Sequence, residues 1–409
     1  MTDAILVLNA GSSSLKFAVY PVEDGAPAPI LRGKIARIGN DPTFSASDTE
    51  GHELAPQDLM QLGKDAGHDA LIPALLDWVK SHQEGVNIVA AGHRVVHGGR
   101  YHLAPAKVTD TLLGELETLV PLAPLHQPHN LAAIRYVAAF APDLPQIACF
   151  DTSFHRTQDR LATQFALPRA MTDQGIIRYG FHGLSYEYIA GVLPTHIGVR
   201  ASGRVIVAHL GNGASMCAVK DGCSVATSMG FTALDGLMMG RRCGTLDPGV
   251  VLYMMDHMNL ASDEITHVLY KESGLLGVSG ISNNMSTLQA SDAPEAREAI
   301  ELFCYRAASE LAALTTTIGG LDALVFTAGI GENSALVRSL ICERLKWMGL
   351  DLDKDANDAN AVRINAADSN VDVLVIATNE ESIIANATQR LILSEVRNQP
   401  DSNASGDHR

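Results

Sequence analysis

The chain of 409 residues is long enough for two or three domains of roughly 150 residues each. Hydrophobic residues make up 46% and charged residues 19%, which allows a large buried core and excludes general disorder and a coiled coil. Thirty Lys and Arg residues against 46 Asp and Glu residues give a formal charge of −16, which argues against nucleic acid or an anionic membrane as a partner.

The six cysteines show no CxxC and no paired Cys/His spacing, which indicates reduced thiols and no structural zinc site. The N-terminal segment lacks the basic stretch and longer apolar run of a signal peptide. No apolar run approaches the roughly 20 residues that span a bilayer. These features predict a cytoplasmic protein.

Taken in chain order, the first predicted element is a hairpin of two strands around a Gly/Ser-rich turn, at residues 5–8, 9–14 and 15–20. The same pattern opens the second half of the chain at 205–208, 209–215 and 216–220. In one register, four identities align between the two hairpins: Val7, Gly11, Ala18 and Val19 with Val207, Gly211, Ala218 and Val219. The repeat suggests a duplicated domain.

Further buried strands are predicted where apolar, β-branched runs are bounded by turns, at 86–91, 146–150, 323–327 and 371–377. A helix is expected to begin at Pro294 and to end at Gly319, because apolar residues recur at helical spacing up to Ile318. Residues 351–358 are predicted to form a solvated connection, and residues 398–409 to be disordered.

Three glycine-rich turns lie at strand ends: Asn9–Lys16, His209–Gly213 and Gly329–Asn333. Small residues let backbone N–H groups approach an anion closely, and Lys16 would add a point charge. None is a Walker A loop, and either hairpin alone could be an ordinary turn. Gly329–Asn333 is the stronger candidate, since it is predicted between a buried strand and a helix N-terminus that favours negative charge.

Arginines in two segments are candidate anion ligands. Arg94 in His93–Gly99 follows a predicted strand and could bind a carboxylate or phosphate with two hydrogen bonds, although a surface ion pair is the alternative. Arg241 and Arg242 lie in a glycine-rich loop of an acidic chain. The methionines of the preceding run, Met229–Gly240, are interpreted as packing residues.

Three further segments could carry chemistry at predicted strand ends or turns. Asp151 ends a strand, where ligands of α/β sheets gather, with a helix N-cap as the alternative. His182 could have a functional role or be a buried, hydrogen-bonded histidine. Glu380 and Glu381 could hold Mg²⁺, or form an acidic pair at a helix N-terminus.

Taken in order, these motifs resemble the acetate kinase family along nearly the whole chain. The resemblance is carried by eight segments: Val7–Lys16, His93–Gly99, Pro121–His126, Phe150–His155, Tyr179–Ser185, His209–Gly213, Gly329–Asn333 and Thr378–Glu381. It implies an α/β fold of two duplicated actin/sugar kinase/Hsp70-like (ribonuclease H-like) domains with a cleft between them. The implied N-terminal domain is 1–151 plus 385–409, closed by the C-terminal helix, and the nucleotide-binding domain is 152–384.

The resemblance also implies a reaction: reversible, Mg²⁺-dependent, in-line transfer of the ATP γ-phosphoryl group to acetate, giving acetyl phosphate and ADP. It assigns catalysis to Asp151, His182 and Arg242, and the metal (Mg²⁺, with Mn²⁺ as an alternative) to Asn9 and Glu380. The acyl substrate would contact Arg94, Val96, Leu125, Phe181 and Ala233. ATP would contact Lys16, His209, Leu210, Gly211, Asn212, Gly213, Asn284, Met285, Ser286, Gly329, Ile330, Gly331, Glu332 and Asn333. A homodimer is expected.

Two departures from the family pattern affect specificity. Asn284-Met285-Ser286 stands where the family has Asp-x-Arg, which leaves the nucleotide base open. Ala233 replaces a proline of the acyl pocket, so propionate is expected to fit better, a difference of only about 1–3 kcal/mol per methylene. A propionate or butyrate kinase is the nearest alternative, and an actin/Hsp70-like ATPase module is a more distant one. A carboxylate is already nucleophilic, so Asp151 is expected to orient groups rather than to abstract a proton.

Overall fold

The computed structural model describes residues 2–11, 14–23, 28–54, 63–82 and 85–398. The chain divides into two compact units, one from Met1–Ser153 with Asn379–Arg409 and one from Phe154–Thr378. No helix of the described segments is long and apolar enough to cross a membrane. Each unit is built around one mixed sheet of the described strands.

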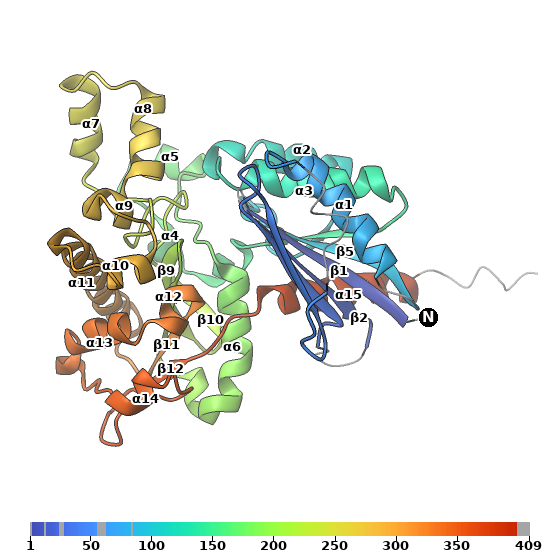
Figure 1. The fold of residues 1–409 in the computed structure, drawn as a ribbon. Helices are drawn as coiled ribbons and strands as arrows, with labels where there is room; N and C mark the ends of the chain where they lie inside the picture. Colours follow the sequence, from blue (N-terminus) through green and yellow to red (C-terminus); the bar gives the residue numbers. More distant parts are fainter. Residues whose placement is uncertain (1, 12–13, 24–27, 55–62, 83–84, 399–409) are drawn as a thin grey trace, which may run out of the picture. The chain divides into compact units, whose positions relative to one another are not determined.

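The first unit contains a seven-stranded sheet in the order β4-β3-β2-β1-β5-β7-β6 (Figure 1). Strands β4 to β1 are antiparallel neighbours, whereas β1, β5 and β7 are parallel, and β6 is an antiparallel edge. The bounds are β1 Thr2–Ala10, β2 Ser14–Pro21, β3 Leu31–Ala36, β4 Thr43–Asp48, β5 Val86–Val95, β6 Ala106–Lys107 and β7 Gln146–Phe150.

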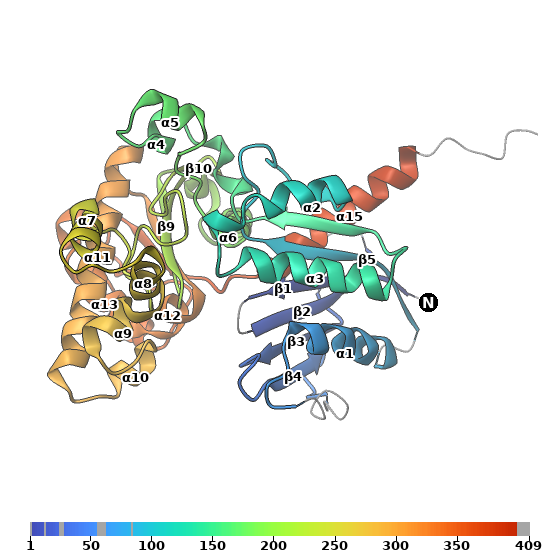
Figure 2. The same ribbon diagram turned by 90° about the horizontal axis from the view of Figure 1, so that it is seen from above.

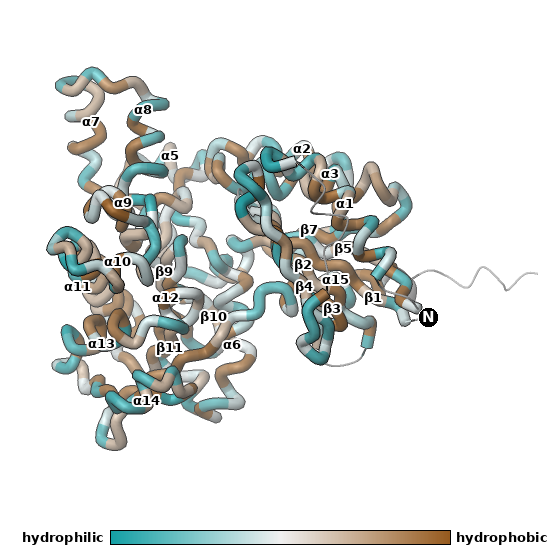
Figure 3. Tube along the Cα trace, in the orientation of Figure 1, coloured by the Kyte–Doolittle hydropathy of each residue, from teal (hydrophilic) through white to brown (hydrophobic). Residues whose placement is uncertain are grey.

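Helices pack against this sheet because the side chains of each strand alternate between its two faces. On β1, Leu6 and Leu8 join a core with Trp78 of helix α1. Helix α15 packs against β1, β2, β5 and β7, whereas α3 packs against β1, β5 and α1, beside which it lies (Figure 2). Hydrophobic residues run along the strands of this sheet (Figure 3). The helices are α1 His68–Ser81, α2 Asp110–Glu117, the 3₁₀ turn Val120–Leu122, α3 Gln127–Phe140 and α15 Glu380–Asn398.

The second unit repeats this topology in a five-stranded sheet, β10-β9-β8-β11-β12. Its strands are β8 Val205–Leu210, β9 Ala214–Lys220, β10 Cys223–Thr227, β11 Ala323–Thr327 and β12 Asp372–Val375. Three antiparallel strands come first in the chain and two parallel strands follow, as in β3-β2-β1-β5-β7. The predicted duplicated α/β fold is therefore confirmed.

The alignment proposed for the two hairpins agrees with the structure for their first strands but not for their second strands. Val7 pairs with Ala18, whereas Val207 pairs with Cys217 rather than with Ala218. When β1 is matched to β8, the second strands are therefore offset by one residue. The reason is loop length, because four residues separate the paired Ala10 and Leu15 but three separate Leu210 and Ala214.

Long helices cover both faces of the second sheet. Tyr186, Ile189 and Leu193 of α6 share a core cluster with β8, β9, β11 and β12, and α11 packs against β8, β9 and β10. The helices and short turns are Ser153–Thr157, α4 Arg160–Thr163, α5 Arg169–Asp173, α6 Gly183–Ile197, Gly198–Ser202, α7 Pro248–Asp256, α8 Ser262–His267, Val268–Glu272, α9 Gly274–Ser279, α10 Met285–Gln289, α11 Pro294–Ile318, α12 Ala328–Asn333, α13 Ala335–Glu343, Lys346–Met348 and α14 Lys354–Asp358.

All the predicted strands are present, and α11 has the predicted bounds, with Gly319 in the left-handed region at φ 74°. Strand β5 runs to Val95, so Arg94 lies on the strand rather than after it. Gly329–Asn333 is not a loop before a helix but forms most of α12 itself. Residues 351–358 are not a simple solvated connection, because they contain α14 with Asn357 buried. The prediction of disorder covers residues 398–409, of which Asn398 is instead the last residue of α15, whereas residues 399–409 lie outside the described residues.

Candidate active site

In the first unit, three predicted site residues meet at one edge of the sheet. Asn9, Arg94 and Asp151 lie at or just beyond the carboxyl ends of β1, β5 and β7. These strands are parallel neighbours with β5 in the middle, so the topology brings the three side chains to the same edge. Ligands of open α/β sheets bind at this edge.

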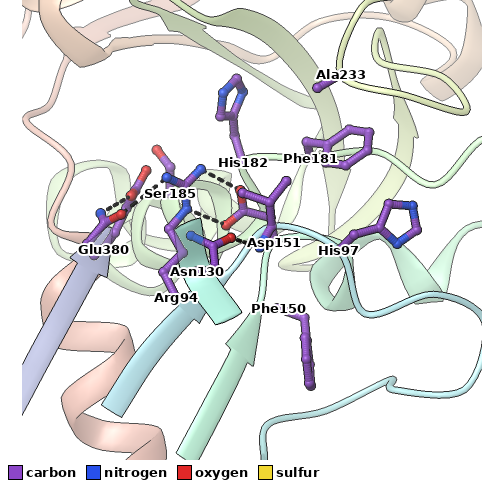
Figure 4. A network of polar contacts seen from close by, with 12 residues as sticks. Arg94, His97, Asn130, Phe150, Asp151, Phe181, His182, Ser185, Ala233 and Glu380 are labelled. Carbon is purple, nitrogen blue, oxygen red and sulfur yellow. Dashed lines mark hydrogen bonds and ion pairs between the residues drawn. The ribbon is translucent and has the colours of Figure 1, made fainter. Parts of the chain in front are cut away.

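Arg94 and Asp151 form a bidentate ion pair (Figure 4). Arg94 Nε donates to Asp151 Oδ1 at 2.9 Å and Nη2 donates to Oδ2 at 2.6 Å, with the Asp151 side chain 1% exposed. Burial alone would lower the pKa of Arg94, but Asp151, Glu380 and Glu381 together raise it above its ordinary value. The guanidinium is thus a permanent cation in a fixed orientation.

The start of α15 adds two carboxylates to this edge. Asn9 Nδ2 donates to Glu380 Oε2 at 3.1 Å and to Glu381 Oε1 at 3.3 Å, and Asn9 Oδ1 accepts from Arg94 Nη1 at 3.2 Å. The proposed metal residues Asn9 and Glu380 are therefore in contact. Their hard oxygen atoms are the ligand type that Mg²⁺ prefers, and Mg²⁺ usually takes only one or two protein carboxylates.

The segment after β5 is held by amide side chains of α3, which the sequence did not single out. Asn130 Oδ1 accepts from the Val96 N–H at 3.0 Å, and Asn130 Nδ2 donates to the Ala10 carbonyl at 2.6 Å. Gln127 accepts from the His97 N–H and donates to its carbonyl. Asn130 thus ties the chain beyond β5 to the end of β1. Val96 is buried and Leu125 half-buried.

Lys16 lies on β2 opposite Asn9, so both side chains project from the same face of the sheet. The turn between them is described only in part, because Ser12 and Ser13 lie outside the described residues. The Gly11 carbonyl accepts a hydrogen bond from His68 Nε2 at 2.8 Å, a contact with no sequence signal. Lys16 is exposed, as a residue that meets a soluble anion must be.

In the second unit, the predicted donor His182 occupies an unusual backbone position. It immediately precedes α6 with φ 57°, in the left-handed region. Its Nδ1 lies 2.8 Å from Ser215 Oγ, and its ring stacks on that of His209 at 4.2 Å between centroids. His209 Nδ1 is held in turn by Ser185 Oγ at 2.9 Å.

Gly213 brings the predicted phosphate turn against two of the predicted catalytic side chains. A Cβ atom at Gly213 would lie 2.7 Å from Arg242 Nη2 and 3.3 Å from His182 Nε2. The close approach requires glycine, and it shows that Arg242, His182 and the backbone of Gly211–Gly213 share one small volume. Backbone N–H groups beside a guanidinium and an imidazole can bind an anion.

The loop that carries Arg242 is tightly packed through its glycines. Gly236 (φ 98°) and Gly244 (φ 73°) are left-handed, and a Cβ at Gly244 would lie 2.5 Å from the Gly236 carbonyl oxygen. Arg242 Nη1 donates to the Ala233 carbonyl, so the arginine also fixes the proposed acyl-pocket loop. Ala233 and Phe181 are buried, and so are Met229, Met238 and Met239, as expected for packing residues.

His155 supports the His182 turn, although it was noted only as part of a motif. Its Nε2 donates to the Phe181 carbonyl at 2.9 Å, and its Nδ1 lies 2.9 Å from Ser224 Oγ. Burial lowers the pKa of His155 to about 4, despite the hydrogen bond to Phe181. This histidine is therefore neutral and structural.

Helix α12 offers an open backbone approach at Gly329, where an added Cβ would have no atom within 4 Å. Glu332 Oε1 accepts from the Ala328 N–H at 2.7 Å and the Thr378 N–H at 3.3 Å, so this carboxylate joins two segments that follow parallel strands. Arg338, which the sequence did not indicate, is fully buried and donates to the carbonyls of Gly331 and Glu332.

The segment Asn284–Ser286 starts α10, with Asn284 as its N-cap. Asn284 Oδ1 accepts from the Ser286 and Thr287 N–H groups, and Met285 is buried. The neighbouring Asn283 donates from Nδ2 to Asn212 Oδ1 at 3.2 Å, which links this segment to the His209–Gly213 turn.

The chain is similar to known proteins over nearly its whole length. The family model described as the acetokinase family matches residues 4–386. An acetate kinase of Rhodopseudomonas palustris is 52% identical over 396 residues, 96% of this chain and 99% of the relative. One from Methylocella silvestris is 48% identical over 398 residues, covering 96% and 98%.

Solved structures show the same similarity. A propionate kinase of Francisella tularensis has a TM-score of 0.86 at 38% identity, covering 95% of this chain and 99% of that one. An acetate kinase of Porphyromonas gingivalis has a TM-score of 0.83 at 32% identity, covering 95% and 100%.

Proposed function

The chain belongs to the acetokinase family, with the actin/sugar kinase/Hsp70-like fold, and we propose that it transfers the γ-phosphoryl group of ATP reversibly to acetate, giving acetyl phosphate and ADP. It is thus a phosphotransferase with a carboxyl group as acceptor. Phosphoryl transfer needs in-line positioning and neutralised charge more than covalent help from the protein. The fixed guanidinium of Arg94 in the first unit, and Arg242 with His182 and the Gly211–Gly213 backbone in the second, offer N–H groups that can position an anion.

Arg94 is the proposed carboxylate ligand. A guanidinium has five N–H groups, and the described contacts to Asp151 and Asn9 use three of them. Two remain, one on each Nη, which is the number that a substrate carboxylate needs for bidentate binding. Asp151 orients this fork and takes no proton from the substrate, because the attacking carboxylate is already ionised.

Arg242 and His182 are the proposed ligands of the transferring phosphoryl group. Their side chains meet the Gly211–Gly213 backbone in the second unit, and a guanidinium, an imidazole N–H and backbone N–H groups all stabilise negative charge on oxygen. We propose that the rest of the ATP lies along the His209–Gly213 turn, the start of α12 at Gly329–Asn333 and the Asn284–Ser286 segment, with Lys16 near the phosphates.

Asn9 and Glu380 would hold Mg²⁺, and Mn²⁺ prefers the same oxygen ligands. When bound, such an ion neutralises phosphate charge. The described groups around Arg94 explain the need for it: one positive charge is surrounded by three negative ones, from Asp151, Glu380 and Glu381. Without added positive charge, this cluster would repel an anionic nucleotide.

The acyl pocket would be lined by Val96, Leu125, Phe181 and Ala233. Ala233 is smaller than the family's proline, and a propionate kinase is among the similar structures, so propionate is a proposed second substrate. A pocket wider by one methylene changes specificity by about 1–3 kcal/mol.

A cytoplasmic homodimer is also proposed. No residue of α7 is buried, and its apolar side chains Leu252, Tyr253 and Met255 are exposed. Exposed apolar side chains on one short helix are typical of an interface. If α7 takes part in the dimer, Leu252→Asp should shift the light-scattering mass toward the monomer, and an unchanged mass would exclude α7.

The bidentate Arg94–Asp151 pair at the carboxyl edge of a parallel sheet is the observation that carries the proposed function. The test is acyl-phosphate formation, trapped as hydroxamate, with acetate, propionate and butyrate and with a panel of nucleotides. ADP formation should depend on the carboxylate. Carboxylate-independent ATP hydrolysis would instead favour an ATPase module.

A further inference from the structure

Ser215 joins the side chains of His182 and Tyr186 through hydrogen bonds. Its side chain is fully buried, with Oγ at 2.8 Å from His182 Nδ1 and in a short hydrogen bond with the Tyr186 hydroxyl. Tyr186 is also fully buried. Burial, together with the nearby Cys217, raises the pKa of Tyr186 well above its ordinary value, so the phenol keeps its proton.

The proton order along Tyr186, Ser215 and His182 follows from counting donors and acceptors. Among the described residues, Ser215 Oγ is the one hydrogen-bond partner of the Tyr186 hydroxyl, and the described partners of Ser215 Oγ are Tyr186 and His182. If His182 Nδ1 carried the proton and donated to Ser215, the hydroxyl proton of either Ser215 or Tyr186 would have no acceptor. A buried donor without a partner costs about 1–3 kcal/mol.

One arrangement satisfies every group: Tyr186 donates to Ser215, Ser215 donates to His182 Nδ1, and the ring proton is on Nε2. We propose that Ser215 and Tyr186 are positioning residues that hold His182 as the neutral Nε2–H tautomer. A doubly protonated His182 ring would also donate from Nδ1 to Ser215, so it would again leave the hydroxyl proton of Ser215 or Tyr186 without an acceptor. The guanidinium of Arg242, which lies near Nε2, also disfavours a positive charge on the His182 ring.

The consequence for catalysis rests on the proposed function, in which His182 stabilises the transferring phosphoryl group. Nε2 is the ring nitrogen that approaches Gly213 and Arg242, so the selected tautomer directs the N–H toward the proposed phosphoryl site. The opposite tautomer would direct a lone pair toward an anion. Fixing the tautomer through the second ring nitrogen therefore makes His182 a donor.

The test is ¹⁵N NMR of protein labelled in histidine, with His182→Gln to assign the His182 signals. The wild type should show a pyrrole-like Nε2 and a pyridine-like Nδ1. Ser215→Ala should shift both signals toward a mixture of tautomers and lower kcat about 10- to 100-fold, the range for residues that orient a functional histidine, with KM for ATP changed less than about twofold. Tyr186→Phe should keep the tautomer and lower kcat less.

Ser369→Ala is the matched control, since its half-buried hydroxyl supports the remote Asp351 and Val371 backbone and its loss should leave kcat unchanged. Thermal melts separate misfolding from a positioning effect. An Nδ1–H tautomer in the wild type, or unchanged kcat and signals in a folded Ser215→Ala, would overturn the inference. Absence of carboxylate-dependent transfer in the wild type would overturn the proposed function but leave the tautomer result standing.

Discussion

Asp151→Asn tests the ion pair that orients the proposed carboxylate ligand. Asparagine keeps one acceptor for Arg94 but turns an NH₂ group toward the second guanidinium N–H, so one charge-assisted hydrogen bond is lost and two donors face each other. Such a bond is worth about 1.5–3 kcal/mol, and breaking a buried pair costs at most about 3–5 kcal/mol. We expect a loss of roughly 3 kcal/mol, or a melting temperature lower by about 6–12 °C.

The catalytic effect should exceed the effect on stability. Without Asp151, the nearest anions for Arg94 are Glu380 and Glu381, and a reorientation of the guanidinium by about 1 Å is enough to cost roughly 100-fold in rate. The assay is acetyl-phosphate formation at saturating ATP, in parallel with urea denaturation.

Asp322→Asn is the matched control. Arg204 and Asp322 form another bidentate pair, with Nε to Oδ2 at 2.9 Å, but their side chains are 40% and 28% exposed and none of the proposed substrate residues is involved. This variant should lose less than about 1 kcal/mol and keep its kcat. An Asp151→Asn enzyme with kcat within about threefold of the wild type would refute the orienting role of Asp151.

Three further outcomes are expected. Gly213→Ala would place a Cβ 2.7 Å from Arg242 Nη2 and should lower kcat about 10- to 100-fold, whereas Gly191→Ala, in open space on α6, should leave kcat unchanged; equal rates for both would contradict the packing argument. Burial lowers the pKa of His93 and of His155 to about 4, so the unfolded chain binds more protons than the folded one and stability falls as the pH drops from 6.5 toward 4. Urea denaturation at pH 5 should therefore show a free energy of unfolding lower by about 2 kcal/mol per histidine than at pH 7. An unchanged urea midpoint would contradict this pH dependence. Glu380→Gln should raise the Mg²⁺ concentration for half-maximal rate about 10-fold, which the exposed Glu343→Gln should not do; no change in a titration would exclude Glu380 as a ligand.

Local patterns in the sequence predict the strands well, and they indicate which polar side chains lie together at a sheet edge. Apolar runs ending at Leu8, Ala91 and Phe150 marked the three parallel strands, and polar residues just after such runs must gather at one sheet edge. Strand β5 continues to Val95 through His93 and Arg94, since pairing with β7 rather than hydropathy determines its end.

The supporting residues could not be predicted because they come from other segments. Asn130 and Gln127 lie on a helix at least 30 positions after the Val96 and His97 backbone groups that they hold. His155 and its partner Ser224 are 69 positions apart. The one-residue offset of the repeat was also hidden, since Ala18 and Ala218 are identical but occupy different register positions. Identity between repeats does not report hairpin loop length.

The acidic balance of the chain also bears on binding. In the first unit, three carboxylates surround Arg94. In the second unit, Arg242 donates one N–H to the Ala233 carbonyl. The hydrogen bonds of each arginine to the protein thus fix the orientation of its guanidinium before any substrate binds. A guanidinium fixed in this way loses little rotamer freedom on binding, so it can discriminate geometry where net charge cannot. With a chain charge of −16, whole-protein steering does not favour ATP or a carboxylate, and recognition must depend on these oriented N–H groups together with a divalent cation.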